Sequence, residues 1–309
     1  MDSPNHGAGV ALFGISCASA KFCVAVGERN SSSTVVETWS GDAWTNAASP
    51  KIPGTNALTD VDCLSAQSCW AVGSDKGRSL IEHWNGSIWR LSSGTETNYP
   101  LQGISCVTTS FCVTVGQSGN RSVVMTWRGV RWSIAFQKHP LRDVSCTSTN
   151  FCEAVGFAGS VGPYAESWNG SHWIRSNFVA PHSSVLNAVS CWSSHGCLTV
   201  GANFATDEAS VEAWNGKEWS TVPSRQETKS LVLLGVACDK AKVCDAVGQA
   251  KGAPFVIKWS GGTWNESASA SNAGRGLLDG IAFREGTAIA VGSHQPELRS
   301  LIERGPATK

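Results

Sequence analysis

One motif recurs seven times along the 309-residue chain, at intervals of roughly 45 residues. Each copy combines Leu-x-(Gly/Asp)-Val-Ser-Cys, a short polar turn, Cys-x-Ala-Val-Gly, a variable segment and Glu-x-Trp-Asn-Gly-x-x-Trp, with some substitution. Repeats of this length are typical of solenoids, propellers and arrays, in which each copy is one supersecondary unit. The last glycine of the Ala-Val-Gly segment falls at Gly27, Gly73, Gly116, Gly156, Gly201, Gly248 and Gly292.

Each repeat holds four short apolar segments, which in the second copy are Leu58–Cys63, Cys69–Val72, Leu80–Trp84 and Ile88–Leu91. They are bounded by turn residues, and none shows a sustained helical period, which indicates strands. The sequence therefore predicts an all-β chain: a seven-bladed β-propeller of four-stranded antiparallel blades. We expect a single domain over residues 1–309, with repeats beginning near residues 12, 58, 101, 141, 186, 233 and 278. The last repeat lacks the tryptophan hairpin, so the seventh blade is expected to be incomplete, with three strands or a fourth borrowed from a terminus.

The twelve cysteines fall into six pairs, each separated by five residues. Every pair brackets a turn between two strands, which brings its Cβ atoms within disulfide reach. Zinc sites gather four ligands at shorter spacing, so no metal is expected. In the seventh repeat Phe283 replaces the first cysteine and the second is lost with it. We expect an intra-blade disulfide in six blades, and hence an oxidising compartment. The pairs are Cys17-Cys23, Cys63-Cys69, Cys106-Cys112, Cys146-Cys152, Cys191-Cys197 and Cys238-Cys244.

The tryptophan hairpin suggests how blades pack. If Asn85-Gly86 forms a two-residue turn, Trp84 lies opposite Ser87, and the carboxylate of Glu82 can accept a hydrogen bond from a buried indole N–H. Two tryptophans depart from the repeat: Trp70 is expected in the core, and Trp192, inside a cysteine turn, on the surface.

Composition excludes several classes of function. Lys plus Arg equals Asp plus Glu, 24 each, so the chain lacks the basic surface that nucleic acid requires. No apolar run is long enough to insert into a membrane. The first six residues have neither the basic nor the apolar region of a signal peptide, and the cysteines lead us to expect an extracellular or cell-surface location. No catalytic residue and no cofactor are indicated, and we expect a monomer.

The pattern Gly-Val-Ser-(Cys/Phe), Ala-Val-Gly, then a glycine turn three residues before Trp resembles the Asp-box (BNR) propellers. It is most similar to the seven-bladed photosystem II assembly-factor type, and its cysteine pairs resemble repeats of secreted bacterial proteins of unassigned role. The Asp-box aspartate position is held by tryptophan, as at Trp84 and Trp127. The box is a folding element in that family, so the resemblance implies a fold and no activity.

One position, near the start of the first strand, differs chemically in every repeat while its apolar neighbours persist. A second set of arginines precedes the third strand. The alternative to a binding role is that both sets are solvent-exposed residues at the rim of the channel. Because function sits on variable positions of a rigid scaffold, we expect ligand binding at the channel mouth, by Thr59, Gln102, Arg142, Asn187 and Asp279, with Arg78 and Arg121 on the rim.

These residues predict a non-enzymatic binding module for a glycan or an extracellular protein. Arg142 is the expected anchor, because a guanidinium can bind a carboxylate or a vicinal diol through two hydrogen bonds. A structural spacer in a larger surface protein is one alternative. The other is a polysaccharide hydrolase or lyase that uses Arg142, Asp143 and Asp279.

Overall fold

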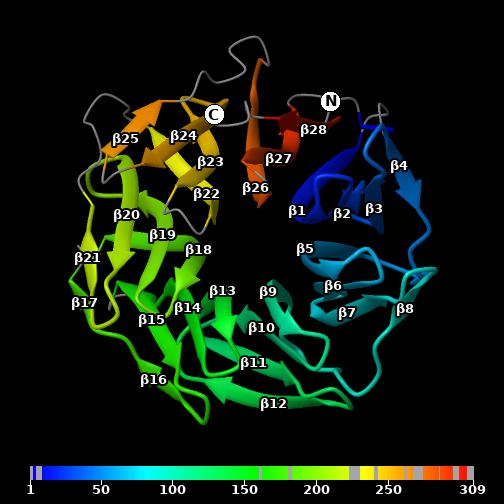
Figure 1. The fold of residues 1–309 in the computed structure, drawn as a ribbon, viewed down its shortest axis with the longest axis horizontal. Coiled ribbons are helices and arrows are strands. Elements are labelled where there is room, and N and C mark those ends of the chain that lie inside the picture. Colours follow the sequence, from blue (N-terminus) through cyan, green and yellow to red (C-terminus); the bar gives the residue numbers. More distant parts are fainter. Residues whose placement is uncertain are drawn as a thin grey trace.

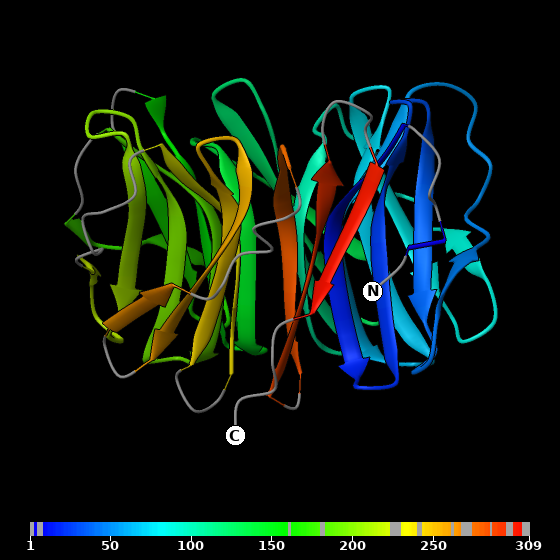
Figure 2. The ribbon, with the colours of Figure 1, turned by 90° about the horizontal axis from the view of Figure 1, so that it is seen from above.

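The computed structural model describes residues 3–4, 9–159, 162–179, 183–222, 230–239, 243–260, 263–266, 274–284, 286–294 and 299–304. Its strands form separate twisted sheets arranged in a ring around a central channel, as in a β-propeller (Figure 1). In the side view the strands run between the two faces of a disc (Figure 2). No described segment forms a helix long and apolar enough to cross a membrane.

Each sheet is an antiparallel meander whose first strand lies nearest the channel. The first strands are β1 (Val10–Ser19), β5 (Asn56–Ser65), β9 (Leu101–Thr108), β13 (Leu141–Ser148), β18 (Ser184–Ser193), β22 (Leu231–Cys238) and β26 (Gly276–Arg284). The second strands are β2 (Phe22–Arg29), β6 (Ser68–Asp75), β10 (Phe111–Ser118), β14 (Phe151–Phe157), β19 (Gly196–Asn203), β23 (Cys244–Ala250) and β27 (Thr287–His294).

The outer half of each sheet holds the third and fourth strands. The third strands are β3 (Ser33–Trp39), β7 (Arg78–Trp84), β11 (Arg121–Trp127), β15 (Pro163–Trp168), β20 (Glu208–Trp214), β24 (Ala253–Ser260) and β28 (Arg299–Arg304). The fourth strands are β4 (Trp44–Ala47), β8 (Trp89–Leu91), β12 (Trp132–Gln137), β16 (Trp173–Arg175), β21 (Trp219–Thr221) and β25 (Thr263–Glu266).

The expectation of a seven-bladed propeller with an incomplete seventh blade is wrong in the number of blades, which is six. Six complete blades are found, each with the four-stranded antiparallel meander and one disulfide. The remaining sheet, β26-β27-β28, has three strands, and within the described residues it has no fourth strand and no disulfide. A further departure is β17 (Phe178–Val179), which pairs parallel to β21 and gives one blade a fifth strand.

The topology gives the disc two different faces. The connections from one blade to the next and those between second and third strands lie at the end where each innermost strand begins; we call this the linker face. The cysteine turns and tryptophan turns lie at the opposite end, the turn face. Register supports this division, because Val10 pairs with Arg29 at one end of the first sheet and Cys23 pairs with Trp39 at the other.

The core lies between neighbouring sheets. Val24 and Val26 of β2, for example, pack against Leu58 and Val61 of β5. Since both faces of the second strands are covered in this way, these strands are apolar at most positions, and the polar residues within them, such as Thr114 and Glu153, are buried.

The six predicted disulfides are confirmed, each between cysteines directly opposite one another in the first and second strands. In the three-stranded sheet the equivalent pair is Phe283 opposite Ala288. The two cysteines are therefore lost together at one cross-strand position, as the sequence indicated.

The tryptophan hairpin differs from the prediction. Trp84 lies directly opposite Trp89, so the loop has four residues rather than two. Within it Asn85 Oδ1 accepts hydrogen bonds from the N–H groups of Ser87 and Ile88, and Gly86 has a φ of +91°. The indole N–H of Trp84 donates to the carbonyl of Ala66, in the cysteine turn, and not to Glu82. The same bond occurs in four other blades and ties the two turns of each blade together.

The N-terminal segment joins the three-stranded sheet to the first blade. In blade two, buried Glu82 accepts hydrogen bonds from Ser49, which lies in the preceding linker. In blade one the equivalent Glu37 accepts one of 2.7 Å from Ser3. Ser300 of β28 in turn donates to Ser3 Oγ at 2.7 Å. Ser3 thus takes the place that a linker serine holds elsewhere in the ring.

Candidate functional site: the central channel

The variable position of each repeat is a β-bulge. The first and second strands of every sheet shift register by one residue near the linker face, for example between Leu141 and Asp143. The residue passed over is the one that differs between repeats. A bulged residue is free of the pairing pattern, and bulges re-aim side chains beside functional sites. The seven bulged residues are Phe13, Thr59, Gln102, Arg142, Asn187, Leu234 and Asp279.

The repeated Ala-Val-Gly glycine permits this bulge. A Cβ atom on Gly27 would lie 1.9 Å from the carbonyl oxygen of Ala11, and one on Gly73 would lie 2.0 Å from that of Ala57. The other five glycines of the series face equally close backbone carbonyls. The innermost strand crosses the second strand so closely at the bulge that only glycine fits.

The innermost strands of all seven sheets surround a cavity of about 350 Å³ on the ring axis. This volume lies within the range of small-molecule sites, roughly 300–1,000 Å³. All seven bulged residues line it, including the five predicted ligand-binding residues Thr59, Gln102, Arg142, Asn187 and Asp279. Whether they bind a ligand stays a prediction.

Three of the bulged side chains already bond to the next sheet. Thr59 Oγ1 donates to the carbonyl of Leu101 at 2.8 Å. Arg142 Nη1 donates to Asn187 Oδ1 at 2.6 Å, and Asn187 Nδ2 donates to the carbonyl of Leu233 at 2.8 Å. Arg142 is half-buried, and desolvation lowers its pKa. Arg142 is therefore part of an inter-sheet chain of hydrogen bonds, which the sequence did not indicate.

Acidic side chains dominate the charge of the channel wall. Asp60 and Asp143 each accept a backbone N–H from the following sheet, from Ile104 and Val189, both at 2.8 Å. Burial raises the pKa of Asp143 to about 6, and it raises that of Asp60, which the charge of Asp143 raises further. Both carboxylates thus hold adjacent sheets together.

Asp62 performs a similar function one layer closer to the turn face. Its Oδ2 accepts the N–H of Cys106 at 2.7 Å, and its Oδ1 accepts the hydroxyl of Ser16 at 3.2 Å. Desolvation raises its pKa to about 6. Sequence reasoning missed Asp60 and Asp62 as channel groups; the signal available was an acidic residue where other repeats have glycine or serine.

Asp279 is the carboxyl least explained by the architecture. It lines the cavity from the three-stranded sheet, and burial alone raises its pKa to about 7. Asp60, Asp62 and Asp143 each accept a hydrogen bond from a backbone N–H group, whereas no such bond to Asp279 is found among the described residues.

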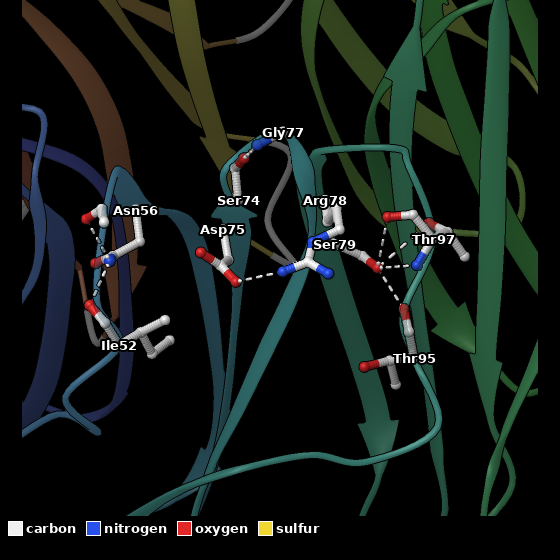
Figure 3. Close-up of polar contacts among 10 residues, drawn as sticks. Ile52, Asn56, Ser74, Asp75, Gly77, Arg78, Ser79, Thr95 and Thr97 are labelled. Atoms are coloured by element: carbon white, nitrogen blue, oxygen red, sulfur yellow. Dashed lines mark hydrogen bonds and ion pairs between the residues drawn. The ribbon is translucent and has the colours of Figure 1, made fainter.

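The two predicted rim arginines lie outside the cavity. Arg78 is exposed at the start of β7 and forms a 3.2 Å ion pair with Asp75 of its own hairpin (Figure 3). Arg121, at the start of β11, is exposed as well, and neither lines the cavity. The serine that follows Arg78 does have a structural role: Ser79 Oγ accepts the N–H of Thr97 at 2.8 Å and donates to the carbonyl of Thr95, which anchors the linker (Figure 3).

The two tryptophans that break the repeat are both packed. Trp70 is 4% exposed and contacts Trp132 edge to face, which confirms the core prediction. Trp192 stacks on Trp259 at 6.0 Å and is partly buried between two blades, so the expectation of a surface position is wrong. Among the described residues no group of three His, Cys, Asp or Glu side chains is arranged to hold a metal ion.

These features define a β-propeller whose channel wall is built from bulged residues. No protein-family model matches the chain. The curated proteins contain no match either.

Solved structures do share the fold. A structure of YCF48, a photosystem II assembly factor, bound to a D1 peptide superposes with a TM-score of 0.70 at 13% identity, over 98% of this chain and 93% of that one. YCF48 from Cyanidioschyzon merolae gives 0.66 at 14% identity, over 97% and 96%. The fucose-specific lectin from Aleuria aurantia gives 0.60 at 13% identity, over 85% and 97%. The similarity to the assembly-factor type thus holds for the fold, and nothing found supports the Asp-box assignment.

Proposed function

We propose that residues 1–309 act as one extracellular binding domain that holds a glycan, or a segment of another protein, at the channel mouth on the linker face. One observation carries this proposal. The bulged residues, which are not paired with the neighbouring strand, are the same residues whose side-chain chemistry changes from repeat to repeat. They surround a concave cavity, as ligand sites require.

The charges of the wall favour a neutral polar ligand over an anion. The charged side chains that line the cavity are Asp60, Asp62, Asp143 and Asp279 against the single Arg142. One of the N–H groups of Arg142 already donates to Asn187. A glycan hydroxyl can donate to a carboxylate or amide oxygen and accept from a guanidinium, whereas a ligand carboxylate would be repelled by the acids. A neutral glycan is therefore the first ligand to test.

The disulfides and the structures of similar fold support an extracellular binding module. Six disulfides favour an oxidising, extracellular compartment. Structures with the same fold include YCF48 bound to a D1 peptide and the fucose-specific lectin from Aleuria aurantia. Both are consistent with a binding module that recognises a peptide or a sugar.

A polysaccharide-acting enzyme is the second candidate, because of Asp279. A carboxyl whose pKa is raised to about 7 is suited to act as a general acid. Asp143, in the same channel, has a pKa of about 6, but both of its oxygens accept backbone N–H groups. That engagement favours a structural role for Asp143 and weakens the pairing of two catalytic carboxyls.

The test blocks the channel mouth without disturbing the bulge. Phe13 already occupies the bulge of the first sheet, so Gln102→Phe should fold normally while it fills the cavity from the third. The labelled protein is applied to a glycan array, and Lys217→Phe, in an exposed turn on the opposite face, is the control. We expect wild type and Lys217→Phe to bind the same glycans and Gln102→Phe to lose them.

Each other outcome selects a different function. Equal binding by Gln102→Phe excludes the channel mouth. Release of reducing sugar by the wild type, lost in Asp279→Asn, selects the enzyme. Silence in the array, in the reducing-sugar assay and in peptide binding selects the structural spacer.

A further inference from the structure

The outer edge of β12, the last strand of the third blade, is exposed and unprotected. This strand has six residues, whereas the other fourth strands have three or four. It ends its sheet at the rim of the ring (Figure 1). Within the described part of the chain no strand pairs with its outer edge.

One face of β12 is apolar along its full length. Trp132, Ile134 and Phe136 alternate along the strand and therefore share a face. Trp132 is buried against Trp70 of the second blade, at a ring distance of 5.3 Å. Ile134 and Phe136 follow along the same strand toward the linker face and are 40% and 59% exposed. Tyr99, from the linker between the two blades, lies 5.4 Å from the ring of Phe136.

The other outermost strands are blunted in ways that β12 is not. Charged residues interrupt β8 and β16, at Arg90 and Arg175, and β4 and β25 have only four residues each, which limits the edge that they offer. The edge of β21 is covered by β17. By contrast the six residues of β12 read Trp-Ser-Ile-Ala-Phe-Gln, with no charge and no proline. Natural proteins protect edges of this kind because they pair readily with other strands.

The chain itself shows how such an edge receives a strand. β17 lies parallel to β21, with Phe178 opposite Trp219. The two rings stack with their centroids 5.7 Å apart and an interplanar angle of 21°. Trp132 holds in β12 the position that Trp219 holds in β21, so the same mode of strand addition is available there.

The flanking charges identify the occupant. Arg131 and Lys138 bracket β12, are both exposed, and have no carboxylate in salt-bridge distance among the described residues. If two copies paired antiparallel through this strand, Arg131 would face the second copy's Lys138 at both ends, and like charges directly opposite are destabilising. A strand with acidic ends would meet opposite charges instead.

We propose that β12 binds an extended peptide segment of another protein as an added strand, with apolar side chains at alternate positions and acidic residues at its ends. Main-chain hydrogen bonds would supply affinity and the apolar face would supply side-chain selection, as in other cases of β-augmentation. This surface lies at the rim of the ring and is separate from the channel mouth.

The experiment measures binding of short fluorescent peptides by anisotropy. One peptide alternates Val and Phe and carries two Asp at each end; its counterpart carries Lys instead. We expect wild type to bind the acidic peptide at least roughly tenfold more tightly than the basic one, as several cross-strand charge pairs allow. Arg131→Glu combined with Lys138→Glu should reverse this preference. Hydrogen exchange should slow in Ser133–Gln137 when the acidic peptide is bound.

Ile134→Lys places a charge on the edge and should abolish binding. Ile174→Lys is the matched control, since Ile174 is 48% exposed on the outermost strand of the next blade. Gln102→Phe, which blocks the channel, should bind the peptide normally, so that failure here and failure at the channel are distinguishable. The proposal is overturned if wild type does not bind the acidic peptide, if Ile134→Lys binds it as wild type does, or if the protein forms a dimer that Ile134→Lys disrupts.

Discussion

The side-chain oxygen of Ser16 accepts a 3.0 Å hydrogen bond from the backbone N–H of Cys63, one blade further along the chain. The same bond recurs around the channel, with Asp62 as the acceptor for the N–H of Cys106. Elsewhere a serine Oγ accepts the N–H of a cysteine at 3.0 Å: Ser105 from Cys146, Ser145 from Cys191 and Ser190 from Cys238. Alanine replaces the serine at Ala237 of β22 and at Ala282 of β26, so the link is missing on both sides of the three-stranded sheet. The serine of the repeated Val-Ser-Cys segment is therefore an inter-blade link, and its absence marks where the ring is joined least firmly.

The series makes a prediction at Asp62. Asp62→Ser should keep the bond to Cys106 and remove a carboxyl whose burial is unfavourable, so it should leave the free energy of unfolding unchanged or raised at neutral pH. Asp62→Ala leaves the Cys106 N–H without its acceptor and should cost about 1–3 kcal/mol. Urea titration of the two variants measures the difference. Equal destabilisation by both would show that this position acts through packing rather than through the hydrogen bond.

Stability should rise as pH falls from about 8 to about 5. Burial raises the pKa of Glu82, Glu153 and Glu212 to about 7, as it does for Asp279, and it raises that of Asp62 and Asp143 to about 6. Unfolded carboxyls titrate near 4. Between these pH values the folded state binds more protons than the unfolded state. The contribution of these carboxyls to the free energy of unfolding is therefore complete below pH of about 4 and is lost as the pH rises through 6 to 7.

The measurement is the melting temperature across this range, where we expect an increase of several degrees toward acid. His83, whose pKa burial lowers, opposes the trend but is a single group. Glu82→Gln should make the melting temperature depend less on pH and should raise it at alkaline pH. Glu218→Gln, in an exposed turn, should change neither the pH dependence nor the melting temperature. A melting temperature that falls on acidification would contradict the assignment of these carboxyls as buried and without cations.

Individual residues show how much of the structure could be predicted from the sequence. The cross-strand cysteine pairs and the weak last repeat are local signals, and both were predictable. Arg142 and Asn187 line the channel, where the sequence predicts a binding site, but the bond between them was not predictable. It joins bulges 45 residues apart and depends on how far each bulge turns its side chain. β17 left no pattern to detect, since a two-residue strand is defined by its neighbour β21 and not by its own sequence. The tryptophan register failed for a similar reason: Asn85 caps a four-residue loop through its side chain, and Asn-Gly alone does not distinguish that loop from a two-residue turn.

Ser3 and Ser49 should be energetically equivalent. Each donates to the buried glutamate of the following blade, Glu37 and Glu82 respectively. Replacing either serine with alanine removes a hydrogen bond from a buried carboxyl and should destabilise the fold by about 1–3 kcal/mol. Thermal unfolding of the two variants side by side provides the test. A negligible effect of Ser3→Ala beside a clear effect of Ser49→Ala would mean that the N-terminal segment does not close the ring.

The three-stranded sheet should accept a seventh disulfide. Phe283 and Ala288 lie directly opposite one another at the position of the six native cysteine pairs. Phe283→Cys combined with Ala288→Cys should therefore oxidise without rearrangement, because the register that aligns Cys17 with Cys23 is repeated here. Constraining so short a loop is worth about 2 kcal/mol in the entropy model, less whatever packing the lost phenyl ring provided. Thiol alkylation followed by intact mass under non-reducing conditions should find no free cysteine in the variant, and urea unfolding should show a gain that reduction abolishes. Two alkylatable thiols in the folded variant would mean that the first and second strands of this sheet do not share the register of the six blades that contain a disulfide.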